Sequence, residues 1–300
     1  MVNFVDDLNS KGYCIIPNIL SIEKCDNYIN KIWDWLESLG TNINRTDSTT
    51  WNHKNWPENY RGIIKHYGIG HEQFVWDIRC EKNVIDVFTK VWNTSDLFVS
   101  FDAICVMKPP EISGKFTKTH WIHNDQSFLN SNRISVQGLV NLEDTLQEDS
   151  TFTLYENSHK YHEEFGKYFN IKQKENWYKL QKEEIQWLEN KGLNQIRLDI
   201  PKGSMLLWDS RLFHANCCAI KGRKNKRFRY VIYVSMAPKS FSTNADIKKR
   251  QKAFKEKRLT THWTRQVQLV PKNPRLYSNS KLNNINAPYN TPIVSNKSLI

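Results

Sequence analysis

Apolar residues recur at helical spacing in two stretches of the N-terminal third. The segment SIEKCDNYINKIWDWLESLG, residues 21–40, begins at a serine, ends at Gly40 and places its apolar side chains on one helical face. These side chains are Ile29, Ile32, Trp33 and Leu36. The pattern predicts an amphipathic helix here and a second helix over residues 83–92. Residues 41–73 are polar and predict long loops.

Beyond residue 96 the pattern changes to short runs rich in β-branched and aromatic residues, which are typical of strands. The expected strands are 97–108, 133–142, 151–155, 196–200, 204–209 and 230–236, with an earlier one within 12–21. One helical insertion, 160–192, interrupts them. Short strands separated by turns predict a mainly β protein with flanking helices, in which antiparallel strands form a barrel or sandwich.

The C-terminal part differs in composition from the rest. Residues 246–258 predict a basic helix, and the Asn-rich segment 278–300 predicts a poorly ordered tail. We therefore expect one domain over residues 1–277, with a barrel core at about 97–240 and a basic helical extension at 246–277. A chain of 300 residues with 39% hydrophobic content is long enough to bury such a core.

The net charge of +12 comes largely from two runs, 221–229 and 248–258. Such runs usually form a solvated face, which is our expectation here, although they also suit contact with nucleic acid or an acidic partner. No apolar run reaches the roughly 18 residues of a membrane span, and the start lacks the features of a signal peptide. The six cysteines form no CxxC pair, so neither a zinc ribbon nor a disulfide framework is indicated. We expect a soluble, intracellular monomer, in the cytoplasm.

A metal centre is the chemistry that the polar residues favour. His123 and Asp125 form a His-x-Asp pair, and strand alternation would put both side chains on one side. His214 lies 89 residues after Asp125, just beyond an apolar strand. Two histidines and one carboxylate leave open coordination positions on iron(II) for a cosubstrate and dioxygen. Zinc held by the same ligands in a hydrolase is the alternative.

Two arginines stand at the head of the strand that follows His214. Arg227 and Arg229 share parity, and a guanidinium from either would bind the distal carboxylate of 2-oxoglutarate in a bidentate manner. A zinc hydrolase would have no obvious use for this arginine. The residues therefore favour 2-oxoglutarate as cosubstrate.

Several motifs, in order from about residue 10 to 240, resemble the phytanoyl-CoA dioxygenase family. They are GYCIIPNIL, HWIHNDQS, VQGLVNLEDTLQEDSTFTLYENSHKYHEEF, KGSMLLWDSRLFHAN and FRYVIYVSMAP. Beyond them, the stretch from KKRQKAFKEKR to NPRLY resembles an extension in an uncharacterised branch of that family found in eukaryotes and large DNA viruses.

This resemblance implies a double-stranded β-helix, a jelly-roll or cupin-like barrel, with His123, Asp125 and His214 as the iron ligands. It also implies Arg229 rather than Arg227 as the 2-oxoglutarate anchor. Because halogenating relatives replace the carboxylate with a small residue, Asp125 implies a hydroxylase or related oxygenase. The family pattern has glycines where this chain has Ser150 and Asn157, which we interpret as a changed loop.

Residues around these motifs carry weaker expectations. Gln126 is a candidate for a hydrogen bond to cosubstrate or substrate. His120 and Trp121 favour packing or surface roles over lining the pocket, His159 favours a turn, and Trp208 and Asp209 favour support of the ligands. The tryptophans are expected to fill core and loop-cover positions, with closure of Trp51 and Trp56 over a substrate as the alternative. The substrate itself remains open. A non-catalytic protein whose basic C-terminal segment binds nucleic acid is the rival hypothesis.

Overall fold

The computed structural model describes residues 3–116, 121–274 and 291–300. Its α-helices are α1 Phe4–Lys11, α2 Ile22–Ser38, α3 Gln73–Arg79, α4 Lys82–Trp92, α5 His162–Tyr168, α6 Lys182–Asn190 and α7 Asn244–Glu256. Short 3-10 helices cover η1 Ser48–Thr50, η2 Ile69–His71, η3 Pro110–Ile112, η4 Ser158–Tyr161, η5 Lys239–Phe241 and η7 Lys297–Leu299.

The strands form two antiparallel sheets. The larger runs in the order β1 Tyr13–Ile16, β10 Met205–Asp209, β6 Val136–Asn141, β12 Arg229–Pro238, β4 Ile104–Met107 and β2 Ile63–Ile64, with β3 Leu97–Val99 also paired to β12. The smaller runs β8 Tyr178–Lys179, β5 His123–Asn124, β11 His214–Asn216, β7 Phe152–Tyr155 and β9 Gln195–Arg197. The expected fold class is confirmed, but the described strands form two open sheets rather than a closed barrel.

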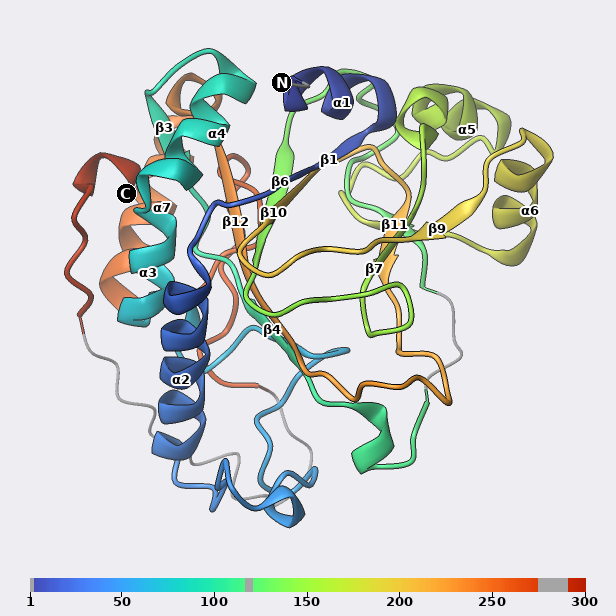
Figure 1. Cartoon of the computed structure of the whole chain (residues 1–300). Helices are drawn as coiled ribbons and strands as arrows, with labels where there is room; N and C mark the ends of the chain where they lie inside the picture. The colour runs from blue at the N-terminus through green and yellow to red at the C-terminus, as the bar shows by residue number, and fades with distance from the viewer. Residues whose placement is uncertain (1–2, 117–120, 275–290) are drawn as a thin grey trace.

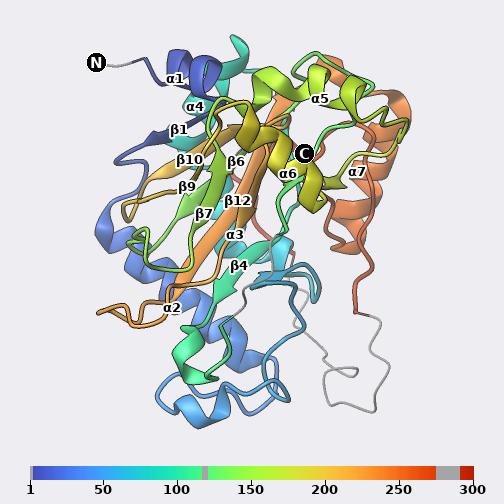
Figure 2. The ribbon, with the colours of Figure 1, turned by 90° about the vertical axis from the view of Figure 1, so that its right-hand side faces the viewer.

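Side-chain alternation along β12 explains how the layers pack. Val231 belongs to the core between the two sheets, whereas Ile232 and Val234 belong to the core under the helices. Both faces of this strand are buried, so its sequence reads as an almost continuous apolar run. Figure 1 shows α2, α3, α4 and α7 on one side of the large sheet, with α5 and α6 at the opposite side of the molecule. Figure 2 shows the strands as a layer in front of α2.

The helix expected over 21–40 is α2. Its N-cap Ser21 accepts a hydrogen bond from the Lys24 backbone N–H at 3.2 Å, which satisfies a free donor of the first turn. Ile32 and Leu36 are fully buried against the large sheet. The expected second helix is also confirmed, as α4.

Other elements differ from the expectations. The run 97–108 is divided into β3 and β4 by residues 100–103. The insertion 160–192 contains two helices, α5 and α6, with β8 between them. The helices α1 and α3 and the strand β2 were not expected, because each is too short to show a clear period.

The two basic runs are not simply solvated faces, so this expectation was wrong in part. In α7, the guanidinium of Arg250 is fully buried, lies 4.3 Å from the Phe98 ring centroid and donates to the backbone oxygen atoms of Val99 and Leu299. In the run 221–229, Arg223 is buried in ion pairs. These arginines hold distant segments together.

The segment 278–300 was expected to be a poorly ordered tail. Residues 278–290 lie outside the described residues. The last ten residues contradict the expectation, because Val294 and Leu299 are buried in the main core. Leu299 also accepts the hydrogen bond from Arg250. Among the described residues, no helix is both long and apolar enough to cross a bilayer.

Candidate metal centre

The two histidines meet through strand pairing. β5 and β11 are antiparallel neighbours in the small sheet, and His123 and His214 are direct partners in their register. Opposite residues of an antiparallel pair have neighbouring side chains. The ring centroids therefore lie 4.4 Å apart, and both side chains are buried.

Asp125, one residue beyond β5, completes the group. Its carboxylate oxygens lie 3.5 Å from Nε2 of His123 and 3.3 Å from Nε2 of His214. One ligand atom from each residue lies within 4.8 Å of the others. The expected same-side arrangement of His123 and Asp125 is thus present, and the three groups suit a single ion bound on one face.

Backbone carbonyls orient both imidazoles. Nδ1 of His123 donates to the Trp121 oxygen at 3.0 Å, and Nδ1 of His214 donates to the Leu212 oxygen at 2.9 Å. Since a carbonyl only accepts, the proton resides on Nδ1 and the Nε2 lone pair is directed to the ligand position.

Protonation states also suit a cation. Burial, followed by repulsion from His214, lowers the pKa of His123 to about 4, so its imidazole is neutral at pH 7. Burial alone would raise the pKa of Asp125, but the neighbouring imidazoles lower it below its ordinary range. The group therefore places a neutral His123 imidazole and an ionised Asp125 carboxylate next to His214.

A glutamine that the sequence analysis did not single out supports the carboxylate. Gln137, on β6 of the large sheet, donates from Nε2 to Oδ2 of Asp125 at 2.6 Å. Strand alternation directs its side chain toward the small sheet, as it does for Leu139. A polar residue facing inward on an apolar strand was the available signal.

The group opens into a cavity of about 150 Å³ between the sheets. Apolar walls come from Ile63, Trp121, Phe152 and Trp208, and polar walls from Asp102, Gln137, Asn216, Tyr233 and His262. His262 belongs to the basic extension, which therefore contributes to the cavity. Burial raises the pKa of Asp102. The sequence analysis missed Asp102, Asn216, Tyr233 and His262 because they come from four separate segments.

Arg229 is a buried guanidinium without an anionic partner among the described residues. It is 1% exposed, and its Nη1 lies 3.5 Å from Sγ of Cys105 and 4.0 Å from Sδ of Met107. Nε and Nη2 have no hydrogen-bond partner. The side chain lies beside Tyr233, which lines the cavity. An unpaired buried charge is costly, so the surroundings suit a carboxylate ligand.

The shared parity of Arg227 and Arg229 had suggested that both side chains face the same way. They do not, because β12 begins only at Arg229 and strand alternation does not extend to Arg227. Its Nη1 lies 3.2 Å from Oδ2 of Asp149, and Asp149 also binds Arg223 at 2.6 Å. Arg227 is thus committed to an ion pair outside the cavity.

Gln126 also lies outside the cavity. Its Nε2 donates to the backbone oxygens of Asn130 and Asn132, and its Oε1 accepts from Ser210 at 2.7 Å. The amide group is therefore fully used in holding a loop, which opposes the expected hydrogen bond to cosubstrate or substrate.

The roles expected for the other residues near the motifs can be compared with their contacts. Trp121 has the expected packing role, since it is buried in an apolar cluster and stacks on His123 at 4.7 Å, and it also lines the cavity. His159 bonds the backbone oxygen of Asn9, in a structural role as expected, and Asn157 has the left-handed φ of 65° that its turn suggested. His120 lies outside the described residues.

Of the tryptophans and the acidic residue considered near the site, only one lines the cavity. Trp208 lies 5.5 Å from the His214 ring and lines the cavity. Asp209 binds Arg211 instead of a ligand. Trp51 and Trp56 pack around Trp33 in and against the main core, which is the packing role expected of the tryptophans, and neither lines this cavity.

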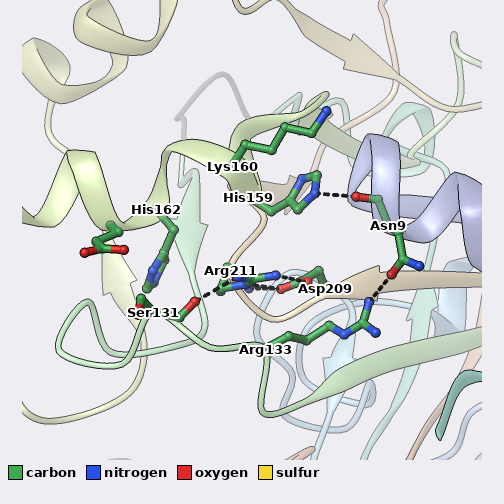
Figure 3. Close-up of a pocket in the computed structure, with 9 residues that line it drawn as sticks. Asn9, Ser131, Arg133, His159, Lys160, His162, Asp209 and Arg211 are labelled. Carbon is green, nitrogen blue, oxygen red and sulfur yellow. Dashed lines mark hydrogen bonds and ion pairs between the residues drawn. The ribbon is translucent and has the colours of Figure 1, made fainter.

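A second, larger cavity of about 440 Å³ lies between α1 and η4 (Figure 3). Its arginines are already engaged, since Arg211 binds Asp209 in a bidentate manner and Arg133 donates to Asn9 at 2.7 Å. It contains no metal-binding group among the described residues. The candidate metal group lines the smaller cavity instead.

Comparison with known proteins agrees with this geometry. The profile of the family "Phytanoyl-CoA dioxygenase (PhyH)" matches residues 8–216, which include all three candidate ligands. The chain belongs to the phytanoyl-CoA dioxygenase family. Proteins similar to this chain in sequence include "Ava biosynthesis cluster protein O" of Aspergillus versicolor, at 29% identity over 87% of each chain. A "Putative phytanoyl-CoA dioxygenase" of Dictyostelium discoideum is 23% identical over 81% of this chain and 77% of that protein.

Solved structures share the fold of this phytanoyl-CoA dioxygenase family member. HygX from Streptomyces hygroscopicus, with nickel, 2-oxoglutarate and hygromycin B bound, superposes with a TM-score of 0.52 at 12% identity over 80% of this chain and 88% of that chain. The epimerase SnoN, in complex with Fe3+, alpha ketoglutarate and nogalamycin RO, has a TM-score of 0.50 at 10% identity over 78% and 82%. At these identities the likeness concerns the fold alone.

Proposed function

We propose that this chain is an iron(II)- and 2-oxoglutarate-dependent dioxygenase that hydroxylates a substrate and releases succinate and CO2. His123, Asp125 and His214 would hold the metal, and Arg229 would bind the distal carboxylate of 2-oxoglutarate. The observation that carries the proposal is a buried three-residue metal group together with a buried guanidinium that has no carboxylate partner among the described residues and lies beside Tyr233 of the cavity wall.

The residues present fit both groups. The Nε2 atoms of both histidines and the Asp125 carboxylate are oriented by their own hydrogen bonds. Nε and Nη2 of Arg229 offer two N–H donors to a carboxylate. Iron with 2-oxoglutarate and dioxygen supplies the oxidising chemistry, and the protein supplies orientation and exclusion of water. Apolar walls formed by Phe152, Trp208 and Trp121 favour such exclusion.

A spectroscopic titration tests this function without knowledge of the substrate. Anaerobic protein with iron(II) should develop a weak visible charge-transfer band on addition of 2-oxoglutarate. Asp125→Ala should abolish the band, because it removes the only carboxylate of the metal group. An unchanged band in Asp125→Ala would sink the ligand assignment.

The arginine is tested in the same titration. Arg229→Gln should weaken 2-oxoglutarate binding by about tenfold or more, since a hydrogen-bonded charge pair is lost. Arg227→Gln is the matched control, because Arg227 is partly exposed and already paired with Asp149. Equal losses in the two variants, or a larger loss in Arg227→Gln, would contradict the role of Arg229.

A further inference from the structure

Trp177 has a backbone conformation that is unfavourable for its residue type. Its φ is +76°, in the left-handed region that bulky L residues rarely adopt. The side chain is 46% exposed, so burial of the indole does not explain the conformation. Strained residues of this kind concentrate at functional sites, where surrounding contacts hold them in place.

Hydrogen bonds hold Trp177 in this conformation next to the metal centre. Its backbone N–H donates to the oxygen of Asp125 at 3.3 Å, and its own oxygen accepts from Nε2 of Gln173 at 3.0 Å. The preceding Asn176 accepts from the backbone N–H of Ser127 at 3.0 Å. The loop is thus tied to the segment that carries the candidate acidic ligand.

The indole lies beside the metal group. Its ring centroid is 5.9 Å from that of His123, and His123 stacks on Trp121. Tyr60, which is 51% exposed, meets the edge of Trp121 at 5.5 Å. Exposed aromatic faces therefore adjoin the cavity on two sides of Trp121.

The cavity is small for a site that must also admit 2-oxoglutarate. A volume of about 150 Å³ holds a group of roughly the size of benzene. The rest of any larger substrate must lie outside the cavity, where the indole of Trp177 is exposed, whereas the Arg61 guanidinium lies over the Tyr60 ring at 5.7 Å from its centroid. Rings stack favourably on such faces in offset or edge-to-face arrangements.

We propose that Trp177 is a substrate-binding residue and that the substrate carries an aromatic or heteroaromatic ring, which stacks on the indole at the cavity mouth. This inference rests on the proposed function, because it assigns a substrate class to the same site. The strained loop presents the indole, and the group to be oxidised enters the cavity.

Binding of simple probes tests the inference. Anaerobic protein with iron(II) and 2-oxoglutarate would be titrated calorimetrically with adenosine, tryptamine and octanoate, the last as a linear comparison. We expect a ring compound to bind the wild type in preference to octanoate. Trp177→Gly should weaken this binding at least about fivefold, and Trp177→Phe should retain most of it. The charge-transfer band with 2-oxoglutarate should persist in both variants.

Thermal unfolding separates binding from packing. Glycine adopts a φ of +76° without strain, so Trp177→Gly should have a Tm equal to or above that of the wild type. Tyr168→Gly is the matched control, because Tyr168 is an exposed aromatic residue in α5, and its loss should lower the Tm.

Three outcomes would overturn the inference: retained ring binding in Trp177→Gly, failure of both ring compounds to bind the wild type in preference to octanoate, or a Tm loss in Trp177→Gly equal to that of Tyr168→Gly. Absence of the charge-transfer band in the wild type would instead overturn the proposed function. The comparison of ring compounds with octanoate would still test the role of Trp177 independently.

Discussion

At the scale of single residues, the metal group depends on side chains that contact the candidate ligands. Gln137 is the clearest case, since its amide donates to the Asp125 carboxylate and is 5% exposed. This bond orients one carboxylate oxygen and leaves the other directed toward His123. Residues of both sheets therefore hold the metal group in place.

Gln137→Leu should lower the affinity for iron(II) by about 10–100-fold, because the carboxylate loses its orienting donor. Competition with a chromophoric chelator would measure this change. Gln147→Leu is a matched control, since Gln147 makes the same kind of bond to Asp199, at 3.3 Å, on the exposed surface. Equal affinities for Gln137→Leu and the control would show that the bond does not orient the ligand.

At the scale of elements, the last ten residues act as part of the fold. Figure 1 shows this segment beside α7, and η7 places the fully buried Leu299 in the main core. The Leu299 backbone also receives one of the two hydrogen bonds of Arg250. Together these contacts join the C-terminal segment, α7 and β3.

Leu299→Ala should therefore reduce the free energy of unfolding by about 2 kcal/mol or more, through lost burial and the cavity left behind. We expect a fall in Tm of roughly 4 °C or more, measured by calorimetry. Ile293→Ala, at a side chain that is 82% exposed, should change the Tm little. A Tm for Leu299→Ala equal to that of Ile293→Ala would contradict the packing described.

At the scale of the whole molecule, buried histidines couple stability to pH. Burial lowers the pKa of His71 to about 3 and that of His162 to about 4. Both are neutral in the folded chain and bind a proton on unfolding at pH values between these and about 6.5. Their contribution to stability is therefore complete above pH 6.5 and is lost as the pH falls toward 4.

His162→Gln should flatten this dependence. Between pH 6 and 4.5, the slope of unfolding free energy against pH should decrease by up to about 1.4 kcal/mol per pH unit, the value for one proton. Denaturant unfolding at several pH values measures the slope. His53→Gln, at an exposed position, is the control. Identical slopes for His162→Gln and the wild type would exclude the burial of a neutral imidazole as a source of acid sensitivity.

Much of the fold could be predicted from local patterns. The helices α2 and α4 and most strands were expected because hydrophobic periodicity reports directly which face of an element is buried. The short helices α1 and α3 were not, because each is too short to show a clear period, and the two-residue strands β2 and β8 were not, because pairing with distant segments defines them.

The three candidate metal ligands were predictable from the sequence, but most of the residues around them were not. His123 and Asp125 were near in sequence, and His214 followed from its place after an apolar strand and from the family resemblance. Gln137, Asp102 and His262 were missed, since their proximity arises only when three distant segments pack around one cavity. Gln126 was overvalued, because adjacency to a ligand does not reveal which way a side chain turns beyond a strand end.

The sequence by itself determined the residue types of the metal group, the mainly β architecture and the family, because these depend on local periodicity and ordered motifs. Only the tertiary structure decided that Arg229 is buried with no carboxylate partner among the residues described, while Arg227 is paired with Asp149. It also decided that Trp177 stands next to His123. The physical reason is that partners, burial and charge compensation belong to contacts between distant segments, which no local pattern records.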